Sequence, residues 1–288
     1  MSRKVGFIGL GIMGMPMAKN LLKAGNTMCV YDISPKATKE MEQLGAKIAS
    51  TPREVAEFSE FFMTNLPDAP HVEEVYLGKN GLIEGAHEGL ILIDTSTTDA
   101  ISTRKIADEV AKAGIKMIDA PVMGVQPTAE QGALVMCVGG LPEVVEACRE
   151  MLMTVGSKVV HAGPIGAGKI LKLTNNLMQG AALCVTAEAL ALAKQMGLDI
   201  ETFAELFKAN LIRNFEFGVF KMVQKNFDAM FKTNLMLKDM RLAHGMATAQ
   251  GASVPMASMG REMLQLAVNG GMGDEDCTSV FKLYDKKN

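Results

Sequence analysis

The stretch "VGFIGLGIMG", from Val5 to Gly14, restricts the possible folds of this chain more than any other. It contains an apolar run that is typical of a buried strand, and the helical stretch "MPMAKNLLKAG" follows it directly. In such a strand–turn–helix unit the first glycine permits a tight turn, the second lets a pyrophosphate approach the backbone, and the third lets helix and strand pack closely. We expect a dinucleotide to bind at this loop, which consists of Gly9, Leu10, Gly11, Ile12, Met13 and Gly14.

A second apolar run, "TMCVYD", ends in Asp32, which lies roughly 20 residues after the glycines, at the spacing typical of a ribose-binding carboxylate. A carboxylate there accepts hydrogen bonds from the ribose hydroxyls and repels a 2′-phosphate. The sequence therefore favours NAD over NADP as the cofactor. Lys36 and Lys39 follow closely and leave this preference open to test.

Short apolar runs alternate with helical stretches from Lys4 to about Gly163. This alternation is typical of βαβ units on a parallel sheet, so we expect an α/β, doubly wound domain over residues 1–163. After Gly168 the pattern changes to helices, beginning with the long stretch "KILKLTNNLMQGAALCVTAEALALAKQMG". We expect residues 164–288 to form a long interdomain helix and an all-helical domain.

Polar turns follow two further strands of the predicted sheet, "TNLPDA" and "DTSTTD". Ligands bind at the carboxyl ends of strands in open α/β sheets. Leu66, Pro67 and Thr97 are therefore expected at the nicotinamide end of the cofactor, with ordinary turn chemistry as the alternative.

The stretch "GAGKILKLTNN" begins the long helix and carries four polar residues. Residues three and four apart share a helix face, so Lys172, Asn175 and Asn176 are expected to lie together, with Lys169 one turn earlier. A solvated helix face would explain the same pattern.

The composition argues against several classes of protein. The chain has 29 basic and 32 acidic residues and a net charge of −3, without the basic stripe of a nucleic-acid-binding protein. We also find no signal-peptide pattern and no apolar run long enough to span a bilayer, and we expect a cytoplasmic protein. The histidines and cysteines lack metal-ligand spacing, so no metal site is expected. We expect reduced core thiols at Cys29, Cys137, Cys148, Cys184 and Cys277.

Four ordered blocks resemble the β-hydroxyacid dehydrogenase family, which includes 3-hydroxyisobutyrate dehydrogenase and tartronate semialdehyde reductase. The blocks are "FIGLGIMGMPMAKNL", "DAPV", "GAGKILKLTNN" and "LKDMRLA", and together they extend over essentially the whole chain. The resemblance implies a Rossmann-type domain, a long interdomain helix and a helical C-terminal domain. It also implies an enzyme that oxidises a short β-hydroxyacid with NAD(P) or reduces a semialdehyde.

The resemblance also implies roles for individual residues. Lys172 matches the catalytic lysine of the family, Asn175 and Asn176 match its substrate-side amides, and Lys238 matches its cofactor-proximal lysine. Hydride transfer changes the charge on the attached oxygen, so a group that can donate and accept a proton is needed beside it. Lys172 meets this need, and we expect Lys169 to be a solvated neighbour.

The substrate loop departs from the family pattern DAPVSGG. Here Met123 replaces the serine and Val125 the second glycine, while Gly124 is retained. A hydroxyl donor is lost and a β-branched residue restricts the backbone, so either the acid group is bound differently or the substrate is unusual. Gln126 and Thr128 are candidate replacement donors. Two further residues are expected to bind substrate: Arg213, for which a surface position is the alternative, and the pocket aromatic Phe231.

The sequence thus predicts an NAD(H)-dependent hydroxyacid dehydrogenase or short-chain semialdehyde reductase. A reductase of a sulfolactaldehyde or succinate semialdehyde type is an alternative because of the altered loop. An imine reductase typically lacks the lysine, and 6-phosphogluconate dehydrogenase is longer and has a histidine where Thr174 stands. A non-catalytic dinucleotide-binding module would also have lost Lys172.

The helical stretch "AALCVTAEALALAKQ" is apolar on more than one face. Such a helix is expected to be covered both by its own domain and by another subunit. We therefore expect a homodimer or a homotetramer.

Overall fold

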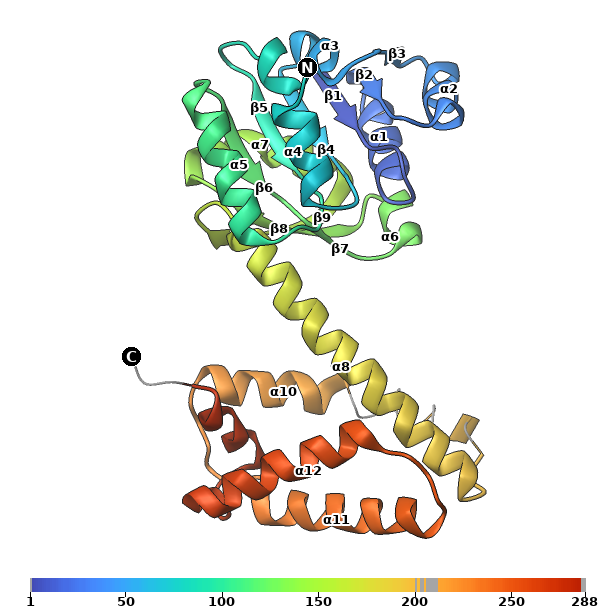
Figure 1. Cartoon of the computed structure of the whole chain (residues 1–288), viewed down its shortest axis with the longest axis vertical. Coiled ribbons are helices and arrows are strands. Elements are labelled where there is room, and N and C mark those ends of the chain that lie inside the picture. The colour runs from blue at the N-terminus through green and yellow to red at the C-terminus, as the bar shows by residue number, and fades with distance from the viewer. Residues whose placement is uncertain (1, 200, 203–204, 206–211, 286–288) are drawn as a thin grey trace. The chain divides into compact units, whose positions relative to one another are not determined.

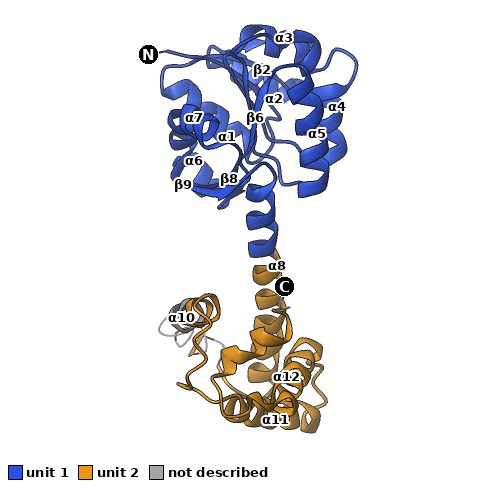
Figure 2. Ribbon diagram, turned by 90° about the vertical axis from the view of Figure 1, so that its left-hand side faces the viewer, with its two compact units in different colours: residues 1–176 blue, residues 177–288 orange. Residues whose placement is uncertain are grey.

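The computed structural model describes residues 2–199, 201–202, 205 and 212–285, with the backbone alone over 212–217. The chain divides into two compact units, Met1–Asn176 and Leu177–Asn288, each described separately below (Figure 2). The predicted boundary after residue 163 lies just before the long helix α8, Ala167–Gln195, which contributes residues to both units.

Unit 1 is an α/β domain, as the sequence predicts (Figure 1). Its described residues form a sheet with the strand order β3-β2-β1-β4-β5-β6-β8-β7, and β9 pairs with β8. The strands are β1 (Lys4–Ile8), β2 (Thr27–Tyr31), β3 (Lys47–Ile48), β4 (Phe61–Thr64), β5 (Ile91–Asp94), β6 (Lys116–Asp119), β7 (Val122–Met123), β8 (Leu134–Gly139) and β9 (Gly156–Gly163).

The first six strands run parallel, so their carboxyl ends meet at one edge of the sheet. Beyond them the sheet is mixed, because β8 runs antiparallel to β6 and β7 runs antiparallel to β8. The sequence pattern did not separate β3, β7 and β9 from their surroundings, since two of these strands have only two residues and half of the residues of β9 are exposed.

Helices cover both faces of the sheet and give it two apolar cores. One core joins buried residues of the sheet to α1 and α7, and the other joins them to α3, α4 and α5. The apolar runs of β1 and β4 are buried on both faces, which explains why they are nearly continuous in the sequence. The helical elements are α1 (Gly14–Lys23), α2 (Pro35–Gln43), α3 (Pro52–Phe58), α4 (Ala69–Leu77), η1 (Leu82–Gly85), α5 (Ala100–Lys112), α6 (Gln126–Glu130) and α7 (Pro142–Val155).

The described residues of unit 2 are helical, apart from connecting segments and one isolated β-bridge between Lys232 and Asp276. The short helix η4 contacts three longer helices and so forms the centre of this unit. Much of the predicted helix Asp199–Asn210 lies outside the described residues. Besides the C-terminal part of α8, the elements are α10 (Ile212–Val223), α11 (Thr233–Ala249), α12 (Pro255–Ala267), η3 (Val268–Met272) and η4 (Cys277–Leu283).

Helix α8 corrects one expectation from the sequence. By length and composition alone it could cross a membrane, since its most apolar stretch has a mean hydropathy of 1.3 and is not buried within the chain. In unit 2 the same helix is bound to α12, because the Glu188 carboxylate accepts hydrogen bonds from the Met256 and Ala257 N–H groups at 2.7 and 2.9 Å. By length and hydropathy, α8 is thus the one helix of the described residues that could cross a membrane, although the sequence predicted no such run.

Candidate active site

The glycine loop joins β1 to α1. Its three glycines, Gly9, Gly11 and Gly14, have three different environments. Gly9 has a φ of +95°, which L side chains rarely adopt. A Cβ on Gly14 would collide with the carbonyl oxygen of Gly9, so this glycine allows the helix to pack on the turn. A Cβ on Gly11 would meet nothing within 4 Å, so no packing inside the chain requires glycine there. The loop therefore fits a ligand that approaches the backbone closely at Gly11.

Asp32 follows β2 and connects two turns at the same edge of the sheet. Its Oδ2 accepts a hydrogen bond from Leu10 N–H at 2.6 Å, and its Oδ1 accepts one from Ser34 N–H at 2.7 Å. A carboxylate has about four acceptor positions, so capacity remains for ribose hydroxyls.

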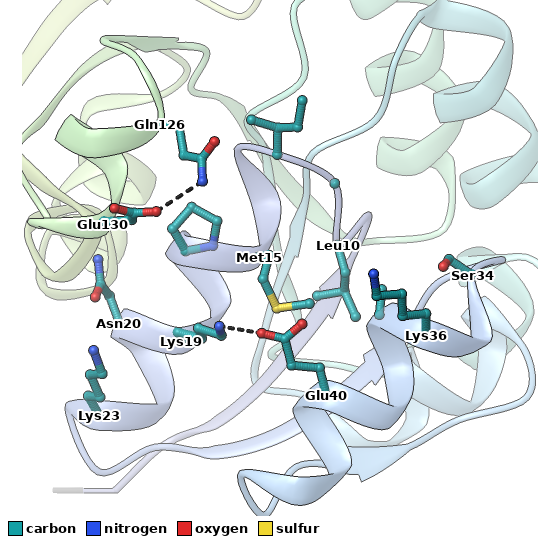
Figure 3. A pocket seen from close by; sticks show the side chains of 14 residues that line it. Leu10, Met15, Lys19, Asn20, Lys23, Ser34, Lys36, Glu40, Gln126 and Glu130 are labelled. Carbon is teal, nitrogen blue, oxygen red and sulfur yellow. Dashed lines mark hydrogen bonds and ion pairs between the residues drawn. The ribbon is translucent and has the colours of Figure 1, made fainter.

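A cavity of about 550 Å³ extends from this loop between α1, α2 and α6 (Figure 3). Leu10, Gly11 and Ile12 form one end of it. Ser34 and Lys36 also line the cavity. Ile33, between Asp32 and Ser34, is exposed and has no positive charge with which to bind a phosphate.

The turns after β4 and β5 are tied together by hydrogen bonds. Leu66 N–H donates to Ser96 Oγ at 2.9 Å, and Thr64 Oγ1 donates to Asp94 Oδ1 at 3.0 Å. Pro67 and Thr97 lie exposed beside them, and Leu66 is half-buried. The structure thus brings these predicted nicotinamide-side residues to the sheet edge that also carries the glycine loop.

Helix α8 begins at this edge as well. Gly166 N–H and Lys169 N–H donate to the two carboxylate oxygens of Asp119, the last residue of β6, at 2.6 and 2.9 Å. A Cβ on Gly168 would collide with Cys137 O, so this glycine lets the helix approach the sheet. Burial raises the pKa of Asp119, while these hydrogen bonds and the nearby Lys169 oppose the rise.

Lys172 lies one turn further along α8 and is half-buried, as is Asn175, whereas Asn176 is exposed. Burial lowers the pKa of Lys172, which the neighbouring Cys137 partly opposes. Within the described part of the chain, none of these three side chains has a hydrogen-bond partner. An amine with a lowered pKa and open donors can transfer a proton to or from a bound molecule.

Lys169 corrects the expectation of a solvated neighbour, because only 1% of it is exposed. Its Nζ donates to Asp94 Oδ2 at 2.9 Å, to Asp94 O at 3.2 Å and to Ser96 O at 2.5 Å. The first turn of α8 directs this side chain toward the end of β5. Helical periodicity alone does not predict this burial, because it does not say which part of the fold a helix face contacts. Lysine beside the glycines of "GAGK" and aspartate at the end of the apolar run "LILID" were the available signals.

Comparison with known proteins decides the family. One family model, described as the NAD binding domain of 6-phosphogluconate dehydrogenase, matches residues 4–163. A second, described as NAD-binding of NADP-dependent 3-hydroxyisobutyrate dehydrogenase, matches residues 166–284. The mitochondrial 3-hydroxyisobutyrate dehydrogenase of Mus musculus is 36% identical over 287 residues, which cover 96% of this chain and 86% of that protein. The chain belongs to the β-hydroxyacid dehydrogenase family.

Membership in the β-hydroxyacid dehydrogenase family confirms the predicted resemblance and identifies an NAD(P)-dependent oxidoreductase that acts on CH–OH groups. The NAD-dependent L-serine dehydrogenase of Pseudomonas aeruginosa is 34% identical, with 98% of each chain covered. Among solved structures, 3-hydroxyisobutyrate dehydrogenase of Mycobacterium tuberculosis with L-serine has a TM-score of 0.69 and 26% identity, over 99% of this chain and all of that one. A variant imine reductase from Myxococcus stipitatus, with NAD+, has a TM-score of 0.88 at 19% identity and the same coverage, and shows the fold alone.

The predicted substrate loop retains glycine at the position where the backbone requires it. Gly124 has a φ of +136°, and a Cβ there would collide with Leu134. Val125 adopts an extended conformation, with φ −122° and ψ 173°, that suits a β-branched residue. The expected backbone restriction at Val125 therefore causes no strain. Met123 is half-buried, Val125 is 64% exposed, and the candidate donor Gln126 is hydrogen-bonded to Glu130 at 3.0 Å.

Three predicted site residues, Lys238, Phe231 and Arg213, belong to unit 2 and are described within that unit alone. Lys238, on α11, pairs with the adjacent Asp239 at 2.8 Å, and Phe231 is 37% exposed just before α11. Arg213 lies on α10, but its side chain is outside the described residues. Their roles stay predictions.

The cysteines differ partly from the expectation of core thiols. Cys29, Cys137 and Cys148 are buried, but Cys277 is half-buried and Cys184 is exposed. Burial raises the pKa of Cys29 to about 11 and that of Cys148 to about 12. Over the described residues, no group of three His, Cys, Asp or Glu side chains is arranged to hold a metal ion.

Proposed function

We propose that this chain catalyses the NAD(H)-dependent, reversible oxidation of a short β-hydroxyacid to its semialdehyde, with Lys172 as the general acid and base. The observation that carries the proposal is the amine of Lys172, which is half-buried, has a lowered pKa and lies one helical turn after residues bound to the ends of β5 and β6. The glycine loop follows β1 at the same edge of the parallel sheet. A dinucleotide on that loop would extend along the edge toward the start of α8.

In the oxidation direction, the carbon loses a hydride and the hydroxyl oxygen loses a proton, so the C–OH group becomes C=O. A dinucleotide held by the glycine loop and Asp32 would supply the hydride acceptor for oxidation and, in its reduced form, the hydride donor for reduction. Neutral Lys172 takes the hydroxyl proton during oxidation, and protonated Lys172 gives it back during reduction. Asn175 and Asn176, on the next turn, supply N–H groups that would hold the substrate without adding charge.

We further propose that NAD is preferred over NADP. Asp32 is held by Leu10 N–H and Ser34 N–H, and its negative charge would repel a 2′-phosphate on the ribose. Lys36 lines the adjacent cavity and is the group through which NADP could still be accepted.

The proposed substrates are 3-hydroxyisobutyrate and tartronate semialdehyde, as the sequence predicts, with L-serine added because two similar proteins carry it in their names. In all three, one carbon separates the carboxylate from the carbon that carries the reacting oxygen. The second candidate is a sulfolactaldehyde or succinate semialdehyde reductase. Met123 and Val125 favour it, because neither side chain has a hydrogen-bond donor for the acid group.

The test is a panel of these compounds, followed at 340 nm with each of the four nicotinamide dinucleotides, beside the Lys172→Ala variant. Turnover of 3-hydroxyisobutyrate, tartronate semialdehyde or L-serine that disappears in the variant supports the main proposal. Turnover of sulfolactaldehyde or succinate semialdehyde alone supports the second candidate. If no compound is turned over although NADH still binds, the chain is a non-catalytic dinucleotide-binding module.

We also propose that the chain forms a homodimer or homotetramer. Large apolar side chains are exposed on helices of unit 2, among them Leu177 at 77%, Leu183 at 72% and Val223 at 73%. We propose that a second subunit, rather than lipid, covers these apolar side chains, in keeping with the proposed cytoplasmic location. Light scattering after size exclusion tests this, and a monomer at micromolar concentration would refute it.

A further inference from the structure

Lys169 has a complete and unusual set of contacts for a lysine that the proposed reaction does not use. Its side chain is 0% exposed, and its ammonium donates to three oxygens, two of Asp94 and one of Ser96. A lysine has three N–H donors, so all of them have acceptors. The residue is therefore fixed in one orientation.

The partners of Lys169 continue to the turns after β4 and β5. Asp94 Oδ1 accepts hydrogen bonds from Thr64 Oγ1 and Ser96 N–H, both at 3.0 Å. Ser96 Oγ in turn accepts from Leu66 N–H at 2.9 Å. One buried cation thus organises the turns that carry Leu66 and Thr97.

The main chain of Lys169 is held independently, because its N–H donates to Asp119 Oδ2 at the end of β6. The residue therefore connects the first turn of α8 to two strand ends, through its side chain and through its backbone. Lys172 lies three residues later, about 4.5 Å further along the helix axis. Its position relative to the turns after β4 and β5 is set by this connection.

Buried ion pairs are often replaceable by apolar residues without loss of stability, so their value can lie in fixing one arrangement. We infer that Lys169 is a positioning residue, which fixes the catalytic Lys172 relative to the turns after β4 and β5. This inference rests on the proposed function of Lys172. Lys169 itself transfers no proton, since all of its donors are bound to the protein.

The test compares Lys169→Met, the double variant Lys169→Met/Asp94→Asn, and the control Lys158→Met. Lys158 is an exposed lysine of β9 in the same unit. The double variant removes both charges and so avoids an unpaired buried carboxylate. For each protein we would measure kcat and KM on the best substrate of the panel, the pH profile of kcat, and thermal unfolding.

We expect Lys169→Met to lower kcat about 100-fold, because a displacement of about 1 Å at a reacting group has that effect. KM should change by less than about threefold, since the substrate-binding groups remain. The double variant should regain thermal stability but not kcat, and the control should match the wild type. Recovery of kcat together with stability would show a merely structural role and overturn the inference, as would a normal kcat in Lys169→Met. If Lys169→Met does not fold, the double variant alone decides.

Hydrogen–deuterium exchange separates failure of this inference from failure of the proposed function. Faster exchange is expected in Lys169→Met at Leu66, at Ser96 and in the first turns of α8, compared with the control variant. This readout needs no turnover. An inactive wild type would refute the proposed function alone, while unchanged exchange at these sites would refute the positioning role.

Discussion

Two lysines three residues apart on α8 have opposite environments. Lys169 is enclosed by acceptor oxygens and forms an ion pair with Asp94 at 2.9 Å. Lys172 is half-buried, and burial lowers the pKa of its amine. A charged lysine with three acceptors stabilises its surroundings, whereas a desolvated amine without them can exchange a proton with a ligand. The difference comes from the strand ends that each residue meets.

Lys172→Ala should lower kcat by about 100- to 10,000-fold, the usual contribution of a positioned acid or base. NADH binding should change little, because the glycine loop and Asp32 are untouched. Stopped-flow kinetics and NADH fluorescence titration would check the two parts. Lys172→Arg is the matched control, since a guanidinium keeps the positive charge but does not release its proton.

The pH dependence of kcat should reflect the lowered pKa of Lys172 with opposite signs in the two directions. Reduction needs the protonated amine, so its rate should fall as the pH rises through this pKa. Oxidation needs the neutral amine, so its rate should rise over the same range. Profiles of kcat in both directions would test this, and limbs at the ordinary lysine pKa would contradict it.

Asp32→Ser should shift the cofactor preference toward NADPH by about tenfold or more, equivalent to ~1.4 kcal/mol. The variant removes the negative charge that opposes a 2′-phosphate and leaves Lys36 in the adjacent cavity. The ratio of kcat/KM for NADPH and NADH is the measurement. Asp68→Ser, at the exposed N-cap of α4, is a control that should leave the ratio unchanged.

Local patterns in the sequence were sufficient to place the glycine loop after β1 and Asp32 after β2, because both lie within one βαβ unit; their roles in binding stay predictions. The pattern failed for Lys169, since its partners Asp94 and Ser96 lie more than seventy residues away. The role of Asp119 as an acceptor for the start of α8 was missed for the same reason. Helical periodicity gives a face, but only the tertiary fold decides what that face meets.

At the scale of elements, the start of α12 depends on a residue of α8. Glu188 accepts hydrogen bonds from two N–H groups in the first turn of α12. A carboxylate at this place also interacts favourably with the positive end of the helix dipole. The alternation of strands and helices in unit 1 could be predicted from the sequence. The antiparallel pairing of β7 and β8 could not, because it depends on the path of the chain after β6.

Glu188→Ala should destabilise unit 2 by about 1–2 kcal/mol, since two half-buried N–H groups lose their acceptor. Chemical denaturation followed by circular dichroism would measure the loss. Glu188→Gln is the control, because its amide oxygen can still accept, and it should recover part of the stability. Equal losses in the two variants would show that charge alone matters.

At the scale of the whole molecule, each unit has its own buried ion pair, Lys169–Asp94 in unit 1 and Lys221–Asp276 in unit 2. In unit 2, Asp276 accepts hydrogen bonds from Met230 N–H and Thr278 Oγ1 and pairs with Lys221 at 3.2 Å. Composition and periodicity predicted an α/β part followed by a helical part. They could not predict which polar residues would be buried within each unit, because that depends on contacts between distant segments.

Unit 2 should lose stability in acid before unit 1 does. Burial would raise the pKa of Asp276, but hydrogen bonds from Thr278, Met230 and Phe231 outweigh it and lower the pKa from 3.8 to about 2. A lowered pKa contributes stability above the unfolded value, and this contribution is lost as the pH falls from about 4 toward 2. The loss is on the order of 2 kcal/mol.

Thermal unfolding of the full chain between pH 6 and pH 2 would check this, with Asp276→Asn for comparison. The variant should be less stable at neutral pH and should lack this acid-dependent loss. An identical acid dependence in variant and wild type would count against the role of Asp276.

The environments of the cysteines make the unmodified chain suitable for site-selective labelling. Thiolates react with maleimides and oxidants, and burial keeps the thiols of Cys29 and Cys148 protonated at neutral pH. Cys184 is the exposed thiol among the five, and it lies on α8. In a single subunit, a fluorophore or spin label should therefore attach mainly at Cys184, and slower labelling of the assembled protein would indicate that the proposed second subunit covers this part of α8.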